Sequence, residues 1–447
     1  MSADQLDRAI RDVLHGLTPD NPAAPAGIAD RIVRRRQRRN ITRAAGAALA
    51  IAAVTVSAVL VTGGDTHRGT QPPASGTSTT SKLLWRTTLP GGTDWRACTT
   101  GPATVYCQGA RYDALAVDAR TGKITWKTRA ASNDGSSAMD LPGVRDGIFY
   151  GYADHAPGTS APGTDVVARD VTSHHVLWRH KVADDSRDRF SAVLFDGGVL
   201  ANTPTFKKAA ALDDKTGRTL WTYAWKQADC DQIAVAGVPY LTCSPDSEKA
   251  PQHSTVVRLD PVTGEARTVA TVKGPTMYVG TDGRTVLLAG KPGGGGSGPV
   301  TVTRVDTRSG VVTRHKAARY PGSVIADGIT LGSRYGEGVA STAADGRNLW
   351  TRDLGLTLRK DPRLFDQREA PSDPAVDLKA RVAYYLDPSG NLVGLDLDSG
   401  SVRWRGRVQL PETEVSSGVA PELILYGHSL VGQIGDHLFR IEPRPGS

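Results

Sequence analysis

Three segments, VDARTGKITW (117–126), LDDKTGRTLW (212–221) and LDLDSGSVRW (395–404), repeat one pattern and decide the fold. Each has an apolar residue followed by Asp, with Gly four positions after the Asp and Trp eight positions after it. An Asp side chain can cap a tight turn, and Gly adopts positive φ without a steric penalty. The unit is therefore predicted to be a β-hairpin whose second strand carries the Trp.

The same frame recurs along most of the chain. Eight positions fit its Asp, at spacings of 36 to 54 residues: Asp118, Asp170, Asp213, Asp260, Asp306, Thr342, Asp396 and Glu442. Gly lies four positions after seven of them, and His174 takes that place after Asp170. Thr268 and Arg314 stand where the pattern has Trp. Further strand signals lie between the hairpins, giving about four strands per repeat, the size of a propeller blade. An all-β, eight-bladed β-propeller with four-stranded blades is predicted; a seven-bladed ring is the alternative, because the repeat around Thr342 is short.

This pattern resembles the pyrroloquinoline-quinone-type (PQQ-like) propeller repeat, in which LD-x-x-TG and a Trp recur once per blade. The resemblance covers residues 82 to 443. That family includes quinoprotein alcohol and glucose dehydrogenases, the outer-membrane assembly lipoprotein of the β-barrel machinery, and many membrane-anchored bacterial propellers. Membership in such a family implies a fold and leaves the chemistry open.

The two ends of the repeat region predict how the ring closes. SKLLWRTTL (81–89) has a Trp strand with no Asp turn before it, and HLFRIEPRPG (437–446) has the turn position, Glu442, with no Trp strand after it. We expect the N-terminal strand to complete the last blade. With this closure, no strand edge at the chain ends is left without its partner strand.

Charge is uneven along the 447 residues. The chain has 54 Lys and Arg against 46 Asp and Glu, a net charge of +8. Residues 1–43 hold nine Arg and five Asp, so half of the excess lies in that short segment. The remaining excess is too small to predict a nucleic-acid-binding face on the propeller, and we expect no nucleic acid as a partner.

Residues 44–64 are uncharged and long enough to cross a bilayer as a helix. A cleaved signal peptide and a buried core helix are the alternatives; the long segment before the apolar run and the lack of a good cleavage site favour the anchor. Seven Arg lie between positions 31 and 43, before the apolar run. The positive-inside rule then predicts a single-pass protein of the cell membrane, with a cytoplasmic N-terminus and an extracellular propeller.

Two segments flank the predicted span. Residues 1–43 are predicted to form an Arg-rich cytoplasmic helical segment, which could dock a cytoplasmic partner or simply contact anionic lipid headgroups. Residues 65–81 consist largely of Gly, Ser, Thr and Pro and predict a flexible tether. The propeller is therefore expected to occupy residues 82–447.

Four cysteines are placed symmetrically about two predicted turns. Cys98 and Cys107 are equidistant from a turn between Pro102 and Ala103, and Cys230 and Cys243 are equidistant from one between positions 236 and 237. Each pair would face across a hairpin and form a local disulfide in an oxidising compartment. A zinc site is the alternative, but neither pair has Cys-x-x-Cys spacing.

Catalytic signatures are weak. KPGGGGSG (291–298) lacks the end of a phosphate loop, and no G-x-S-x-G is evident. His174 and His175, and the DPSGN segment with Asp387, fit turns better than metal sites. The resemblance to quinoprotein dehydrogenases implies adjacent cysteines over the quinone, which this chain lacks. We expect no cofactor and no metal, and a binding role is favoured over an enzyme.

The sequence therefore predicts a binding or scaffold module for a protein, a peptide or an envelope polymer. A quinone-dependent oxidoreductase and a transmembrane sensor with a cytoplasmic regulatory helix are the alternatives. Repeat spacing is longest around 128–165 and 351–380, and both insertions should emerge opposite the Asp–Gly hairpins. Long loops in a compact domain are usually functional. The second insertion sets charges around an apolar centre and supplies the candidate partner-binding residues: Arg363, Leu364, Phe365 and Arg368.

Overall fold

The computed structural model describes fourteen stretches of the chain: residues 82–90, 96–109, 112–129, 143–155, 163–184, 192–205, 207–226, 228–247, 252–290, 300–317, 324–334, 336–356, 371–410 and 420–443. The predicted segments 1–43, 44–64 and 65–81 lie outside them. In the part that is described, no helix has the length and hydropathy needed to cross a membrane.

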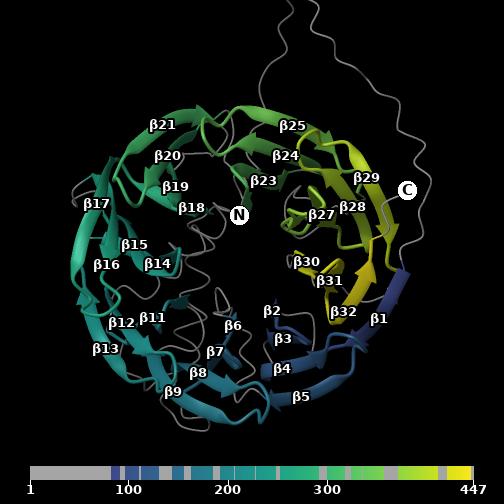
Figure 1. The fold of residues 1–447 in the computed structure, drawn as a ribbon, viewed down its shortest axis with the longest axis horizontal. Coiled ribbons are helices and arrows are strands. Elements are labelled where there is room, and N and C mark those ends of the chain that lie inside the picture. The colour runs from purple at the N-terminus through teal and green to yellow at the C-terminus, as the bar shows by residue number, and fades with distance from the viewer. Residues whose placement is uncertain are drawn as a thin grey trace, which may run out of the picture. The chain divides into compact units, whose positions relative to one another are not determined.

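The described residues form eight four-stranded antiparallel sheets, which stand around a ring in Figure 1. This confirms the eight-bladed propeller and excludes seven blades. Blades 1 to 4 contain β2 (Arg96–Thr100), β3 (Thr104–Gly109), β4 (Tyr112–Asp118) and β5 (Ile124–Arg129); β6 (Gly143–Arg145), β7 (Ile148–Asp154), β8 (Thr164–Asp170) and β9 (Val176–Ala183); β10 (Ala192–Phe195), β11 (Gly198–Asn202), β12 (Lys208–Asp213) and β13 (Thr219–Ala224); β14 (Ala228–Val235), β15 (Val238–Pro245), β16 (His253–Leu259) and β17 (Ala266–Lys273).

The second half of the ring has the same order. Blades 5 to 8 contain β18 (Thr276–Asp282), β19 (Thr285–Gly290), β20 (Val300–Asp306) and β21 (Val312–Ala317); β22 (Val324–Ala326), β23 (Ile329–Arg334), β24 (Glu337–Thr342) and β25 (Asn348–Asp353); β26 (Ala375–Asp377), β27 (Val382–Leu386), β28 (Asn391–Asp396) and β29 (Val402–Arg407); β30 (Glu422–Tyr426), β31 (Ser429–Ile434), β32 (His437–Glu442) and β1 (Lys82–Thr88). The first strand of each blade lies nearest the ring centre, and the last lies outermost (Figure 1).

The two ends of the propeller close the ring as predicted. β1 pairs antiparallel with β32, with Lys82 opposite Glu442 and Thr88 opposite His437. Blade 8 is thus built from three C-terminal strands and one N-terminal strand.

The hydrophobic core lies between the blades. Each of the eight apolar clusters joins two neighbouring blades, as Val166 of β8 and Val199 of β11 do. The middle strands are packed on both faces, so β4 has buried residues at six of its seven positions. A strand buried on both faces reads as a continuous apolar run. Burial of apolar surface between blades therefore holds the ring together.

The Asp–Gly turns have the predicted structure. Asp118 Oδ1 accepts hydrogen bonds from the backbone N–H groups of Arg120 and Thr121 and from the Thr121 hydroxyl. Gly122, at φ +74°, donates its N–H to the Asp118 carbonyl. The same cap recurs at five further repeat positions: Asp170, Asp213, Asp260, Asp306 and Asp396.

The repeated Trp packs on the turn of the next blade. A Cβ added at Gly217 would lie 2.5 Å from the Trp178 ring, so only glycine leaves room for the indole there. Trp178 Nε1 also donates to the carbonyl oxygen of Asp214, in the same turn. Equivalent contacts join Trp85 to Gly122, Trp221 to Gly264 and Trp350 to Gly400.

A β-bulge before each Trp is a feature that the sequence did not predict. In blade 3, Ala211 pairs with Trp221 while Leu212 pairs with Thr219, which leaves Leu220 as the extra residue. The same offset precedes the other five repeat Trp residues: Trp85, Trp126, Trp178, Trp350 and Trp404. Of the two sheets without a repeat Trp, β20–β21 shows no bulge, whereas β16–β17 has one between Val256 and Val257. Since a bulge re-aims side chains, the bulge before each Trp turns the indole toward the neighbouring blade.

Two histidines take part in contacts between neighbouring blades that are made by Trp and Gly elsewhere in the ring. His174 takes the glycine position at φ +63°, and its ring stacks on Trp126 at 4.8 Å between centroids. His315 lies against Gly346, where other blades use Trp. Without the bulge, Arg314 and His315 lie on opposite faces of the strand from those they would otherwise have. His315 instead of Arg314 therefore lies on the face that carries the Trp in other blades.

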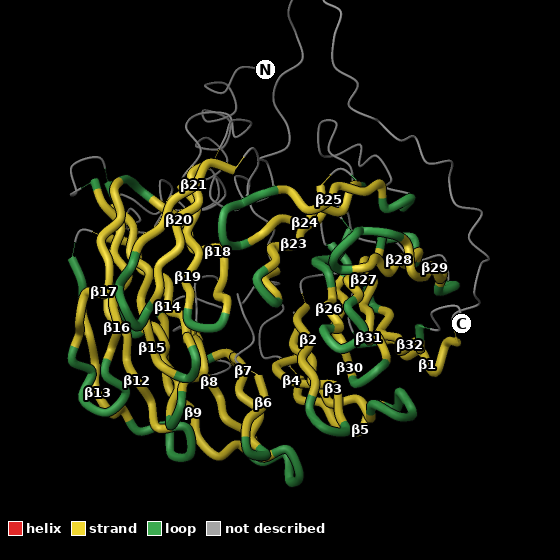
Figure 2. The backbone as a smooth tube through the Cα atoms, turned by 45° about the horizontal axis from the view of Figure 1, so that its top comes forward, coloured by secondary structure: helices red, strands yellow, loops and turns green. Residues whose placement is uncertain are grey.

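The propeller has two faces, which lie at opposite ends of the strands (Figure 2). One end of the strands carries the Asp–Gly turns, such as 118–122, and also the turns between the first and second strands. We call this end the hairpin face. The insertion face is the opposite end, where each outermost strand leads to the next blade. Lys82 begins β1 beside Glu442, so the chain enters the propeller on the hairpin face.

Candidate functional site

The candidate partner-binding residues Arg363, Leu364, Phe365 and Arg368 lie outside the described residues. The strands on either side are described: β25 ends at Asp353 and β26 begins at Ala375. In an antiparallel blade, the end of the fourth strand and the start of the next first strand share one face. The connection therefore leaves and returns on the insertion face, as the sequence predicted.

Both predicted disulfides are present. Cys98 is bonded to Cys107 and Cys230 to Cys243, and each pair joins directly opposed residues of neighbouring strands. The chain has no free cysteine. All four cysteine sulfurs are in disulfide bonds and none is left to bind zinc, so the zinc alternative is wrong.

The Cys230–Cys243 disulfide lies toward the insertion-face end of β14, whereas Cys98 is at the middle of β2. Cys98 is the third residue of β2, and Cys230 is the third residue of β14. Each bond ties the innermost strand of its blade to the second strand. The disulfides thus brace the inner strands of blades 1 and 4.

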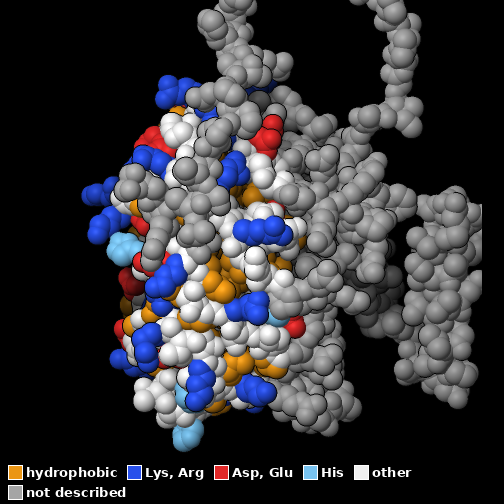
Figure 3. Space-filling view, turned by 90° about the vertical axis from the view of Figure 1, so that its right-hand side faces the viewer, with side chains coloured by type: hydrophobic (Ala, Val, Ile, Leu, Met, Phe, Trp, Pro, Cys, Tyr) orange, Lys and Arg blue, Asp and Glu red, His pale blue; other side chains and the backbone are white. Residues whose placement is uncertain are grey.

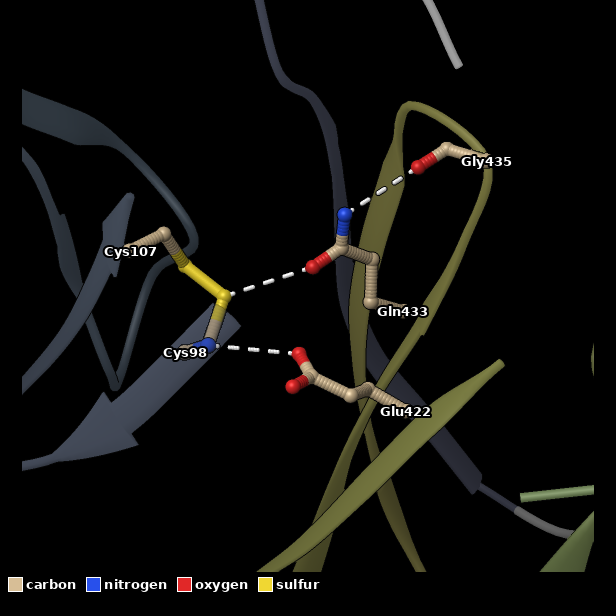
Figure 4. The surroundings of a disulfide bond; sticks show 5 residues. All are labelled: Cys98, Cys107, Glu422, Gln433 and Gly435. Atoms are coloured by element: carbon tan, nitrogen blue, oxygen red, sulfur yellow. Dashed lines mark hydrogen bonds between the residues drawn. A yellow bond between two sulfur atoms is a disulfide. The ribbon is translucent and has the colours of Figure 1, made fainter. Parts of the chain in front are cut away.

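A polar cluster surrounds the first disulfide where blade 8 meets blade 1 (Figure 4). Glu422, the first residue of β30, accepts a 3.2 Å hydrogen bond from the backbone N–H of Cys98. Gln433 of β31 lies opposite Glu422, and its Oε1 is 3.4 Å from Cys98 Sγ. Gln433 Nε2 donates to the carbonyl of Gly435.

Burial raises the pKa of Glu422 to about 8, and the hydrogen bond from Cys98 only partly opposes the shift. At neutral pH the carboxyl group is therefore mostly protonated. A neutral carboxylic acid can donate a hydrogen bond to a carbonyl oxygen, which an ionised carboxylate cannot. As the pH rises through about 8, the group ionises and loses this ability.

A second polar cluster, in blade 2, was not predicted. His155 Nδ1 lies 2.6 Å from Oδ1 of the buried Asp165, and Arg179 Nε lies 3.0 Å from Oδ2 of the same carboxylate. Lys181 is adjacent, because a Cβ on Gly163 would lie 3.0 Å from its Cε and 3.1 Å from the His155 Cβ. The cluster sits at the insertion-face ends of β7, β8 and β9. No motif could have revealed it, because its members come from three strands and only the sheet register joins them.

The turn interpretation of DPSGN is confirmed. Asp387 Oδ1 accepts hydrogen bonds from the N–H groups of Ser389 and Asn391, and its Oδ2 accepts one from the Asn391 amide. His174 and His175 likewise belong to a capped turn, the one that begins at Asp170. Among the described residues, no group of three or more His, Cys, Asp or Glu is arranged to hold a metal ion.

An open depression of about 760 Å³ lies elsewhere, between the outer strands β1 and β5. Thr88, Thr125, Lys127 and Asp436 contribute to its lining. Its lining includes neither Glu422 nor His155, and we do not assign it to either polar cluster.

Comparison with known proteins identifies the fold. Neither family models nor curated protein sequences gave a match. The chain is similar to the crystal structure of BamB from Moraxella catarrhalis, with a TM-score of 0.52, 14% identity, and coverage of 81% of this chain and 99% of that one. It is also similar to the computationally designed Ika8 protein, with a TM-score of 0.54, 12% identity, and coverage of 80% and 98%. At these identities the likeness shows the fold alone, a β-propeller similar to that of BamB.

Proposed function

We propose that this protein is a membrane-tethered, extracytoplasmic propeller that acts as a binding or scaffold module for a protein, a peptide or an envelope polymer. The observation that carries the proposal is the position of Lys82. The chain enters on the hairpin face, and the long connection between β25 and β26 leaves from the opposite face. A tether attached there directs the insertion face away from the membrane.

The cell surface as location is supported by two independent features. Two disulfides fit an oxidising compartment. Residues 44–64 fit a single membrane span with the Arg-rich flank in the cytoplasm. The 17 residues of 65–81 would then reach roughly 20–25 Å as a flexible coil, enough to separate the propeller from the lipid headgroups.

The binding role is supported by the fold likeness to BamB and by the polar groups on the insertion face. Glu422 supplies a neutral carboxyl group there, and the His155 cluster supplies cationic groups. The candidate anchor is Phe365 with Arg363, Leu364 and Arg368, since an aromatic residue beside Arg is typical of an interface centre.

The face assignment can be tested by partner capture with crosslinking on intact cells. The variant Phe365→Ala with Arg368→Ala should reduce partner recovery without lowering the melting temperature. Lys123→Ala with Arg218→Ala, on the hairpin face, is the matched control and should leave recovery unchanged. Loss of recovery in the control alone would assign binding to the hairpin face.

The membrane topology requires a separate test. Protease added to intact protoplasts should remove the propeller and leave a membrane fragment that ends near residue 65. Release of intact protein with a new N-terminus between residues 55 and 75 would instead establish a cleaved signal peptide.

A further inference from the structure

The outermost strands of the eight blades carry charge of one sign. They hold fourteen Lys or Arg residues and a single acidic residue, Asp353. The fourteen are Lys82, Arg86, Lys127, Arg129, Arg179, Lys181, Arg267, Lys273, Arg314, Lys316, Arg352, Arg403, Arg405 and Arg407. Of the eight strands, only β13 has none.

The innermost strands have the opposite bias. They contain five acidic residues, Asp229, Asp231, Asp282, Asp377 and Glu422, and two Arg, Arg96 and Arg145. The whole chain has 54 basic and 46 acidic residues, so its composition does not account for this separation. Positive charge is concentrated on the outer wall of the ring, which we define as the eight outermost strands.

Protection of free sheet edges explains only part of this bias. Charged side chains on an edge strand prevent pairing with other chains, and either sign of charge achieves this. Some of the cations also have structural roles: Arg86 donates to the carbonyl of Gln409, and Arg405 to that of Leu354. The uniform sign across seven strands still requires a reason.

Several of the cations are exposed together on one side of the ring. Lys and Arg side chains gather there in Figure 3, which faces the side occupied by β29 and β1 in Figure 1. Arg86, Lys127 and Arg407 are exposed on three successive outer strands that contain no acidic residue. The depression between β1 and β5, beside Lys127, opens on this surface.

The distribution around the ring favours a linear partner over a flat one. A membrane surface would touch one arc of the wall and leave the cations of the opposite blades unused. A flexible polymer can follow the curvature and contact several strands in turn. Nine of the fourteen cations are Arg, whose planar guanidinium matches the geometry of phosphate oxygens.

We propose that the outer wall binds a linear polyanion with repeated phosphate groups, held by the Lys and Arg side chains of the outermost strands. This site shares Arg179 and Lys181 with the polar cluster on the insertion face. The variant used below changes neither residue, so the two sites can be tested independently. Binding should weaken steeply with salt, because each neutralised phosphate releases a counterion.

The test uses the full-length protein in neutral detergent, with fluorescently labelled inorganic polyphosphate as the probe. One variant neutralises four outer-wall cations that are exposed and make no ion pair with a described residue: Lys127→Gln, Lys273→Gln, Arg314→Gln and Lys316→Gln. We expect its affinity in low salt to fall about tenfold or more. The slope of log affinity against log salt should become less steep by about 3, for four lost contacts.

The matched control removes the same charge from the exposed Asp–Gly turns of blades 1 and 3: Arg120→Gln, Lys123→Gln, Lys215→Gln and Arg218→Gln. Its affinity should change less than threefold. An equal loss in both variants would show that net charge alone draws the probe, and no loss in the outer-wall variant would overturn the site. Binding to anionic lipid vesicles without binding to polyphosphate would replace the polymer with a membrane surface, whereas tighter binding of polyglutamate would exclude phosphate as the recognised group.

Discussion

Trp85 Nε1 donates a 2.8 Å hydrogen bond to the carbonyl oxygen of Ala119, and this contact fastens the two ends of the propeller to each other. Trp85 lies on the outermost strand of blade 8, and Ala119 begins the Asp–Gly turn of blade 1. The indole also covers Gly122, where a Cβ would lie 2.7 Å from the ring. Ring closure thus uses the same contact that joins other neighbouring blades.

Gly122→Ala should destabilise the propeller more than a glycine substitution at a matched turn. At Gly122 the new methyl group meets the Trp85 ring, in addition to the strain of an alanine at φ +74°. Gly197→Ala is the control, because Gly197 has φ +85° with nothing within 4 Å of an added Cβ. We expect a loss of about 1 kcal/mol at Gly197 and about 3 kcal/mol at Gly122 in denaturant unfolding. Equal losses would mean that Trp85 moves aside without cost.

Deleting residues 82–89 should lower the melting temperature far more than deleting the tether 63–81. The first deletion removes β1 and exposes the edge of β32, which can then pair with other chains. The second leaves every described strand intact. Calorimetry and size-exclusion chromatography report stability and monomer content. The same melting temperature and monomer fraction for both deletions would contradict the closure.

Each disulfide should contribute about 2 to 3 kcal/mol, because it restricts a loop in the unfolded chain. Cys230→Ser with Cys243→Ser should lose slightly more stability than Cys98→Ser with Cys107→Ser, since it opens a separation of 13 residues instead of 9. Peptide mapping by mass spectrometry of the native protein should find these two pairs and no alkylatable thiol. A crosslink between the two hairpins would refute the assignment.

Glu422 should make stability decline as the pH rises. Its pKa is about 8 in the folded protein against an ordinary value of 4.5, so between these values the folded state holds a proton that the unfolded state has lost. The unfolding free energy therefore falls from about pH 4.5 to pH 8 and levels off above. Glu422→Gln, which cannot ionise, should match the parent at pH 4 and exceed it by on the order of 5 kcal/mol at pH 9.

The exposed Glu265→Gln is the control for this pH dependence and should follow the parent at every pH. Urea unfolding at a series of pH values measures the effect. If Glu422→Gln shows the parent's decline, the group responsible lies elsewhere.

The candidate site was only partly predictable. Strand order is a local property, so the emergence of the 351–380 insertion opposite the hairpins could be deduced from the repeat. The cysteine pairs were predictable for the same reason, because each pair flanks one turn. No sequence pattern could identify Glu422 as a site residue, because it lies 324 positions from Cys98 and acquires its raised pKa only where β30 meets β2.

The sequence by itself determined the number of blades, the capped hairpins, both disulfides and the pairing of the terminal strands. The hairpins and the disulfides are encoded within single repeats, in which turn residues and apolar periodicity act over ten to fifty positions. The pairing of the terminal strands follows from the incomplete repeats at the two ends of the propeller. Only the tertiary structure decided which residue docks where the repeat fails, as His174 does on Trp126 and His315 does on Gly346. It also decided the separation of charge between inner and outer strands, because a strand's distance from the ring centre depends on how the blades pack around the ring.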